Sequence, residues 1–382
     1  MSDSILLTGG TGLLGRYLLR DLMESGVSVA VVVRPTRRCS AHERVEAIMQ
    51  HWEDQLQRSL PRPFVLSGDL TQPDLGLDPT ELDWVARNCD AVLHNAASLT
   101  FVATSSEAEP YRSNVQGMRH ALDLCRKTGI IDFHHVSTAY VAGLRQGRVF
   151  ETELDIGQSF GNDYEQSKVE AEQMVREAEF LTDPTIFRPA IIVGDSQSGF
   201  TTTFHGFYAA LRVTYTLTTS MHRDEFGDIG CLPTRLTLTG DESKNLVPVD
   251  WVSDVMTHIV NSPQHHGRTY HLAPDEAITT GRICEVLEEI DGFHGTKFVG
   301  PDARISDPSE VEQIFYENIR IYDSYWRNDP LFDLTNTKNA APHLPCPHVD
   351  REMLLHLSRV AIDMKFRFKD RAAVLASKDA LP

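Results

Sequence analysis

The stretch Thr8-Gly9-Gly10-Thr11-Gly12-Leu13-Leu14-Gly15 (TGGTGLLG) directly follows an apolar run at residues 4–8 and opens a helical segment. A glycine-rich turn between a strand and a helix is the context that a dinucleotide-binding loop requires. In such a loop Gly9 permits the tight turn, Gly12 lets the backbone approach a pyrophosphate, and Gly15 lets helix and strand pack closely. The free N–H groups of the helix then face the phosphates. The alternative is a tight turn that binds nothing; we expect a cofactor site that also includes Thr11, Leu13 and Leu14.

Strand-like and helical runs alternate on the C-terminal side of this loop. Short apolar runs rich in β-branched residues, such as VSVAVVV at 27–33, are typical of buried parallel strands. Further strands are expected within 63–69, 90–97, 130–141 and 185–194, and helices at about 41–58, 106–128 and 162–179. This alternation predicts an α/β protein with a Rossmann-type, doubly wound parallel sheet.

The alternation breaks at about residue 196, where threonine, aromatic residues and glycine become frequent. It resumes at NLVPVDWVSDVMTHIV (245–260), which has the order strand then helix. We therefore expect an NADP-binding Rossmann domain at 1–195, to which 245–262 returns. Residues 196–244 and 263–382 would form a smaller, mixed substrate-binding or lid region, ending in a C-terminal part with two helical stretches.

The bulk composition excludes several classes of protein. A formal net charge of −18 argues against a nucleic-acid binder, which needs a basic face. No apolar run approaches the roughly eighteen residues of a transmembrane helix, and no signal peptide is visible, so a cytoplasmic location is expected. The six cysteines form no Cys-x-x-Cys pair. His134 and His135 are neighbours on a strand and face opposite ways, and His265-His266 lies in a polar loop, so no metal site is expected.

The end of the second strand indicates which nicotinamide cofactor binds. Most NAD sites place a carboxylate there for the ribose, whereas NADP sites use arginine. No acid lies between Ala30 and Ala41, and the strand ends at Val33-Arg34. Arg34, helped by Arg44 or Arg38, suits a 2′-phosphate, so NADP(H) is favoured over NAD(H). The alternative is an exposed basic loop.

Two later strand ends add cofactor candidates. Asp69, followed by Leu70, comes after the third strand, where its carboxylate could meet the adenine amino group; an ordinary turn aspartate is the alternative. The next strand ends in His94-Asn95-Ala96-Ala97, whose small residues let the backbone pass close to a cofactor.

At this point the sequence resembles a known family. TGGTGLLG, HNAA, HVSTAYVAG, YEQSK and FRPAIIVGDSQSG occur in the order and approximate spacing of the extended short-chain dehydrogenase/reductases, over about residues 4–275. Within that superfamily, VVVRP, GDLTQPDLGL, HNAASLTF and the FHGFY segment resemble the thioester-reductase and fatty-acyl-reductase branch, the "male sterility" type.

The resemblance implies a set of catalytic residues. Tyr164 would be the proton donor or acceptor, and Lys168 would bind the nicotinamide ribose and lower the tyrosine pKa. A free tyrosine titrates near 10, and a lysine one helical turn away favours the phenolate. Thr138 would hold the substrate carbonyl oxygen with Tyr164, and its neighbour Ser137 would take that role if the match slips by one residue. Asn114 matches a helix asparagine of the family, whose role is either structural or part of a proton relay, and Pro189 begins the segment behind the nicotinamide amide.

The function implied is that of an NADPH-dependent reductase of a carbonyl, most concretely an acyl thioester of coenzyme A or a carrier protein, which becomes an aldehyde or, further on, an alcohol. Two alternatives use the same residues: a nucleotide-sugar epimerase or dehydratase, and a hydroxysteroid-type dehydrogenase. A third is a non-catalytic NADP-sensing protein. The aromatic stripe of Phe204, Phe207, Tyr208 and Leu211 lines an acyl channel or belongs to the core. Both a monomer and a homodimer are compatible with this reading.

Overall fold

A seven-stranded, fully parallel sheet organises the N-terminal two thirds of the chain in the computed structural model, which describes residues 4–219, 221, 229–320 and 325–368. Its strand order is β12-β7-β5-β4-β1-β2-β3. The strands are β1 (Ser4–Thr8), β2 (Ser28–Val33), β3 (Phe64–Ser67), β4 (Ala91–His94), β5 (Asp132–Val136), β7 (Thr185–Pro189) and β12 (Thr269–Leu272). The order reverses between β1 and β4, and ligands of such sheets bind beyond the carboxyl ends of the strands at this point. The expected Rossmann-type fold is confirmed.

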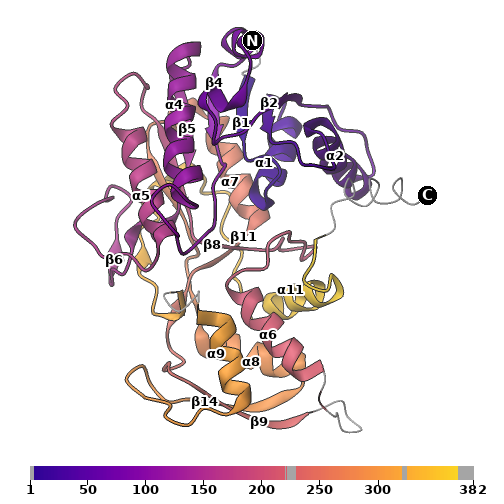
Figure 1. The fold of residues 1–382 in the computed structure, drawn as a ribbon, viewed down its shortest axis with the longest axis vertical. Coiled ribbons are helices and arrows are strands. Elements are labelled where there is room, and N and C mark those ends of the chain that lie inside the picture. The colour runs from indigo at the N-terminus through magenta and orange to yellow at the C-terminus, as the bar shows by residue number, and fades with distance from the viewer. Residues whose placement is uncertain (1–3, 220, 222–228, 321–324, 369–382) are drawn as a thin grey trace.

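Helices cover both faces of this sheet (Figure 1). One layer consists of α1 (Leu13–Glu24), α2 (Ala41–Leu56) and α7 (Val249–Val260); the other of α3 (Pro79–Asn88), α4 (Gly117–Thr128) and α5 (Asp163–Arg176). Side chains alternate along β1, so Ile5 and Leu7 pack toward the first layer and Leu6 toward the second. The sheet is therefore buried on both faces, which explains its continuous apolar strands.

A smaller α/β part lies beyond the carboxyl ends of the strands (Figure 1). Its helices are α6 (Phe207–Thr219), α8 (Thr280–Asp291), α9 (Glu310–Ile319) and α11 (Arg351–Asp363), and it contains the parallel pair β9 (Gly230–Leu236) and β14 (Phe293–Phe298). One core joins α6, α8 and α11 through Leu211, Val286 and Leu357. A second, smaller core packs Phe315 of α9 on Val213 of α6.

Short elements connect the two parts. Three small sheets pair β6 (Arg148–Val149) with β15 (Leu331–Phe332), β8 (Ile191–Val193) with β11 (Leu246–Pro248), and β10 (Ser243–Lys244) with β13 (Ile278–Thr279). The remaining short helices are η1 (Pro73–Gly76), η2 (Arg112–Gln116), η3 (Ala139–Ala142), η4 (Pro263–His265) and α10 (Thr335–Ala340). Segments far apart in the sequence thus meet between the two parts.

Three expectations from the sequence differ from the structure. The helix expected at 106–128 begins only at about residue 112, two residues beyond Pro110, which has no N–H to donate. The strand β12 lies inside 263–382, the range assigned to the substrate region, and yet it joins the large sheet beside β7. The C-terminal part holds four described helices after residue 270, where two helical stretches were expected, because short helices among prolines give a weak periodic signal.

Candidate active site

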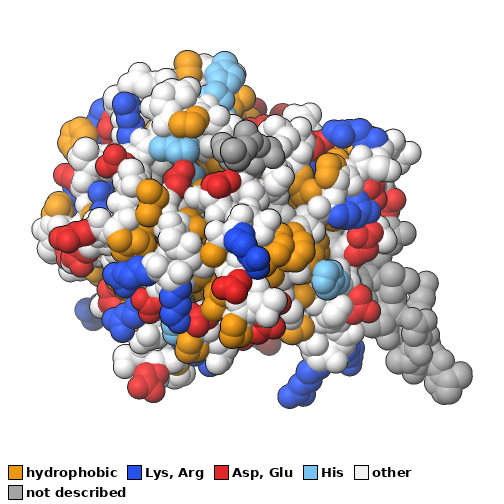
Figure 2. Space-filling model, turned by 90° about the horizontal axis from the view of Figure 1, so that it is seen from above, with side chains coloured by type: hydrophobic (Ala, Val, Ile, Leu, Met, Phe, Trp, Pro, Cys, Tyr) orange, Lys and Arg blue, Asp and Glu red, His pale blue; other side chains and the backbone are white. Residues whose placement is uncertain are grey.

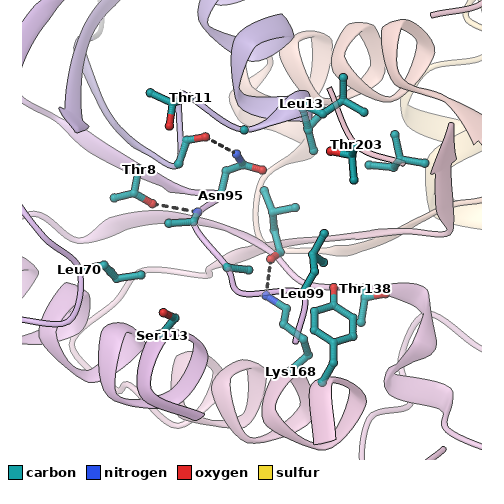
Figure 3. A pocket seen from close by; sticks show the side chains of 18 of the residues that line it. Thr8, Thr11, Leu13, Leu70, Asn95, Leu99, Ser113, Thr138, Lys168 and Thr203 are labelled. Carbon is teal, nitrogen blue, oxygen red and sulfur yellow. Dashed lines mark hydrogen bonds between the residues drawn. The ribbon is translucent and has the colours of Figure 1, made fainter. Parts of the chain in front are cut away.

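A cavity of about 540 Å³ opens at the carboxyl ends of β1, β2, β4, β5 and β7. Its walls come from the loops that follow these strands, from α5, and from two segments of the smaller part, around Thr203 and at Tyr325. Figure 3 shows Thr11 and Leu13 on one side of the cavity and Thr138 and Lys168 on another. The cavity therefore spans the glycine-rich loop and the expected catalytic residues.

The glycine-rich loop is packed so closely that side chains are excluded at two positions. Gly9 has a φ of +73°, and a Cβ there would lie 2.6 Å from the backbone nitrogen of Ala96. A Cβ on Gly15 would lie 2.1 Å from the carbonyl oxygen of Gly9. Asn95 fixes the turn from the next strand, because its Nδ2 donates to that same oxygen at 3.2 Å (Figure 3).

The loop leaves room for a phosphate group. Gly12 is the N-cap of α1, which no described side chain caps. A Cβ on Gly12 would have its nearest neighbour at 3.5 Å, and Gly12 lines the cavity. The first N–H groups of the helix thus meet the cavity without a side chain between them, and this arrangement fits a pyrophosphate.

The arginines expected to read a 2′-phosphate lie at the far end of this loop. Arg44 Nη1 donates to the carbonyl oxygen of Arg34, and Arg44 Nη2 donates to Thr11 Oγ1 at 3.1 Å. The Arg34 side chain is 65% exposed and lies 3.8 Å from the Asp69 carboxylate. Both arginines line the cavity and Arg38 does not. The two guanidinium groups therefore form the cationic end of the site.

The expected catalytic side chains meet on one wall of the cavity. Lys168 is 2% exposed, and its Nζ donates to the carbonyl oxygen of Val136 at 2.7 Å (Figure 3). Burial lowers the Lys168 pKa to about 8, although Glu172 opposes this shift. Burial raises the pKa of Tyr164 to about 12, while a hydrogen bond with the Thr138 side chain lowers it. A charge on the cofactor and a reacting carbonyl would have to supply the rest of the tyrosine activation.

Two expected site residues lie behind the cavity wall. Asn114 is 2% exposed; its Oδ1 accepts from Ser98 N at 2.7 Å and its Nδ2 donates to Ser167 Oγ at 2.8 Å. It joins the loop after β4 to α5, and its part in catalysis stays a prediction. Gly15 also does not line the cavity and acts through its contact with Gly9. The other expected residues line the cavity, namely Gly9, Thr11, Gly12, Leu13, Leu14, Arg34, Arg44, Asp69, Leu70, Asn95, Ala96, Ala97, Ser137, Thr138, Tyr164, Lys168 and Pro189.

The individual residues that line the cavity beside Tyr164 were not singled out from the sequence. Phe101 lies edge-on to Tyr164 with ring centroids 6.0 Å apart, and Tyr325 lies 5.3 Å from Phe101. His205 also lines this end, and burial lowers its pKa, which favours the neutral imidazole. Tyr325 comes from a segment far along the chain with no periodic pattern, so no local signal could have found it.

The aromatic stripe expected near the cavity belongs to the core. Phe207, Tyr208 and Leu211 are at most 3% exposed and pack in the core of the smaller part. The cavity is lined instead by Thr203, His205 and Gly206, just before α6. The acyl-channel reading of the stripe is therefore wrong, because the helix turns its aromatic face inward.

Comparison with protein families and curated proteins gives consistent matches. The model of the family described as male sterility protein matches residues 7–256. A nonribosomal peptide synthetase of Aspergillus flavus, asaC, is 28% identical over 71% of this chain and 26% of its own length. The aldehyde reductase lnaA of the same organism is 27% identical over 92% of this chain and 35% of its own length. The chain thus spans about a quarter to a third of these two relatives.

Solved structures give the same picture. The terminal R domain from the myxalamid PKS-NRPS biosynthetic pathway superposes with a TM-score of 0.74 at 26% identity, covering 97% of this chain and 92% of that one. A UDP-glucuronic acid 4-epimerase from Bacillus cereus, in complex with NAD, gives 0.62 at 16% identity, covering 95% and 98%. At that identity the epimerase shows a shared fold alone.

Proposed function

The chain belongs to the male sterility protein family and is an NAD(P)-dependent oxidoreductase of the short-chain dehydrogenase/reductase type, and on that premise we propose that it is an NADPH-dependent reductase of acyl thioesters. The substrate would be an acyl group on a carrier protein or on coenzyme A, and the first product an aldehyde. The observation that carries the proposal is the meeting of Tyr164, Thr138 and Lys168 on one wall of a cavity whose other end is the glycine-rich loop.

The residues of this wall suit the reduction of a carbonyl. When bound, NADPH supplies a hydride to the carbonyl carbon. The hydroxyl groups of Tyr164 and Thr138 would donate hydrogen bonds to the carbonyl oxygen as negative charge develops there. Tyr164 would then give that oxygen its proton, and Lys168, one helical turn away, would stabilise the phenolate left behind.

For a thioester the reduction produces a tetrahedral hemithioacetal. Its collapse breaks the C–S bond, returns the hydroxyl proton to the Tyr164 phenolate and releases an aldehyde and a thiolate, which takes its proton from solvent. The neutral His205 and the rings of Phe101 and Tyr325 line this end of the cavity. Aromatic walls around a few polar groups are typical of sites that bind a largely apolar acyl chain.

The choice of NADPH over NADH rests on the cationic end of the cavity. The Arg44 guanidinium donates to Thr11 in the glycine-rich loop and to the carbonyl oxygen of Arg34, just after β2. A 2′-phosphate between Arg34 and Arg44 would gain charge-assisted hydrogen bonds that a ribose hydroxyl cannot form. Asp69 lies 3.8 Å from Arg34 and holds its guanidinium near this position.

The relatives support a thioester as substrate. Their names describe a nonribosomal peptide synthetase, an aldehyde reductase and a terminal R domain of a PKS-NRPS pathway. A second solved structure with a TM-score of 0.71 is a thiolation-reductase di-domain from an archaeal nonribosomal peptide synthetase. We propose that this chain likewise accepts acyl groups from a carrier protein and that further reduction to an alcohol uses the same site.

The test is the loss of nicotinamide absorbance with purified protein, comparing NADPH with NADH against acyl-coenzyme A esters, acyl-carrier proteins, aldehydes and ketones. We expect turnover of thioesters with NADPH. Arg44→Ala should raise the KM for NADPH roughly 10-fold or more and leave that for NADH nearly unchanged. Arg38→Ala, an arginine outside the cavity, is the matched control. Activity confined to free ketones, or a preference for NADH, would contradict the proposal.

A nucleotide-sugar epimerase or dehydratase remains the alternative reading of the same residues. Such an enzyme returns the hydride to its substrate and keeps NAD bound. Purified protein that carries tightly bound NAD and converts nucleotide sugars without net oxidation of NADPH would establish it. The arginines at the end of β2 speak against this outcome, because an acidic residue for the ribose hydroxyls is absent there.

A further inference from the structure

Three side chains with metal-ligating atoms meet near the amino end of β5, away from the cavity. Asp132 and His134 are two residues apart on β5 and face the same side of it. His266 follows η4, in the loop that leads to β12. One ligand atom from each residue lies within 4.8 Å of the others, and no second group of this kind occurs among the described residues.

The distances between these groups fit a shared cation, and without one the Asp132 carboxylate interacts with His266 and raises its pKa. His134 Nε2 lies 3.5 Å from Asp132 Oδ1, and His266 Nδ1 lies 3.5 Å from Asp132 Oδ2. A hydrogen bond would usually be about 2.7–3.2 Å long. Two ligand atoms that each lie roughly 2.0–2.2 Å from one metal ion are about 3–4 Å apart, depending on the angle. Both separations fall in that interval, one to each oxygen of the Asp132 carboxylate.

The His266 imidazole is oriented as a metal ligand. Its Nε2 lies 3.0 Å from the carbonyl oxygen of Val260, and because a carbonyl only accepts, the proton is on Nε2. In the neutral ring this leaves the Nδ1 lone pair directed to the Asp132 side. A histidine ligand held by a backbone carbonyl through its other nitrogen is the usual supporting arrangement of metal sites.

The group is buried at His134 and open to solvent at Asp132. His134 is 1% exposed, and its ring packs edge-on against that of His266 with centroids 4.6 Å apart. The Asp132 side chain is 38% exposed, so an ion and water molecules can reach the group. Figure 2 looks onto the end of the molecule where the strands begin, on which acidic, basic and histidine side chains are interspersed.

We propose that Asp132, His134 and His266 bind one divalent transition-metal ion, with Zn²⁺ the best match and water completing its coordination. Two imidazole nitrogens and one carboxylate form a ligand set that Zn²⁺ accepts readily. The ion would connect β5 with the loop before β12. The strands β5 and β12 lie on either side of β7. Its role would be structural, at the edge of the sheet.

The test is calorimetric titration of the chelator-treated full chain with Zn²⁺. We expect one equivalent to bind, and Asp132→Asn or His266→Ala to weaken this binding at least about tenfold. His265→Ala is the matched control, because His265 is the neighbouring imidazole of the same loop and lies outside the group. Zn²⁺ should also raise the Tm of the wild-type protein and of His265→Ala, and raise that of His266→Ala much less.

Cobalt(II) separates this site from the free cysteines, of which Cys231 is exposed. Binding at Asp132, His134 and His266 gives no thiolate-to-metal absorption, whereas binding at cysteine does. Three outcomes would overturn the proposal: no saturable binding of one equivalent, equal binding by His266→Ala, or binding that disappears when the thiols are alkylated. In each case Asp132 and the two histidines would form an ion pair only.

Discussion

At the scale of single residues, Lys168 is a buried side chain whose charge would stabilise the Tyr164 phenolate in the proposed reaction. Its Nζ donates to the carbonyl oxygen of Val136, the last residue of β5. Its pKa of about 8 leaves the ammonium largely charged at neutral pH. The pKa of Lys168 therefore lies close to neutral pH. The pKa of Tyr164 is about 12, so its phenol stays protonated at neutral pH.

Replacing the Tyr164 hydroxyl should separate binding from chemistry. We expect Tyr164→Phe to lower kcat roughly 100- to 10,000-fold, because the proton donor is lost. NADPH binding, measured by nicotinamide fluorescence, should change little. Tyr215→Phe is the control, since Tyr215 lies on α6 outside the cavity wall. A Tyr164→Phe variant with near wild-type turnover would remove Tyr164 from the catalytic role.

The pH profile should follow Lys168. Reduction needs the ammonium, and because its pKa is lowered to about 8, kcat/KM should fall as the pH rises above that value. Below it the lysine is charged and the Tyr164 phenol is protonated, so both groups are in the required state. Lys168→Arg should be slower but lack this fall, since a guanidinium does not lose its proton there. The check is steady-state kinetics between pH 6 and about 10, and a fall retained in Lys168→Arg would assign it to another group.

At the scale of elements, the junction of β1 and α1 combines packing with cofactor binding. Gly15 meets the Gly9 carbonyl oxygen, whereas Gly12 faces the cavity. The two glycines therefore differ in what a methyl group would disturb. The sequence predicts that Gly15 serves packing and Gly12 serves cofactor approach. The distances to the Gly9 carbonyl oxygen show how much room a Cβ would have at each position.

A pair of alanine variants tests this difference. Gly15→Ala places a Cβ 2.1 Å from the Gly9 carbonyl oxygen, so the free energy of unfolding should fall by about 1–3 kcal/mol or more. Gly12→Ala has 3.5 Å of room in the free protein and should unfold nearly as the wild type does. Gly12→Ala should nevertheless weaken NADPH binding, because the added methyl group would occupy the part of the cavity where we expect the pyrophosphate to bind. Urea denaturation and NADPH titration give both quantities; equal stability of the two variants would contradict this account.

The elements of the large sheet were predictable because each carries its own signal. Strands such as 27–33 are apolar and β-branched, and the loop after β1 has its glycines at fixed positions. Short elements without such a period were not predictable: β12 has only four residues, and its place beside β7 depends on pairing with a strand some eighty residues earlier. The inward turn of the α6 aromatic face was likewise decided by tertiary packing.

At the scale of the whole molecule, a buried ion pair of the smaller part contacts the larger part through Tyr140. Lys244 Nζ and the Asp329 carboxylate form a salt bridge with side chains 3% and 5% exposed. Asp329 also accepts from the Tyr140 hydroxyl at 2.6 Å, and Tyr140 lies in η3, two residues after Thr138. None of these partners is near another in sequence, so no local pattern could have predicted the pair. The same holds for Tyr325, four residues before Asp329, and for His266 beside His134.

Breaking this ion pair should be costly. Lys244→Met leaves the Asp329 charge buried and unpaired by lysine, so the free energy of unfolding should fall by about 3–5 kcal/mol. Adding Asp329→Asn should recover part of this loss, because the uncompensated charge is removed. Glu285→Gln is the control: its pair with Arg282 is solvent-exposed and worth at most about 1 kcal/mol. A Lys244→Met variant as stable as Glu285→Gln would show that the pair contributes little.

The position of β12 has a consequence for protein engineering. The Rossmann sheet is closed at one edge by residues 269–272, and Tyr140 and Glu151 bind residues beyond 328. A shortened gene that stops after residue 195 would encode a sheet that lacks β12, so that β7 becomes an unpaired edge strand. Tyr140 and Glu151 would also lose their hydrogen-bond partners. We therefore do not expect residues 1–195 to fold as an independent cofactor-binding domain. Chimaeras that exchange substrate preference should replace the segment around 203–206, which lines the cavity, within the intact chain.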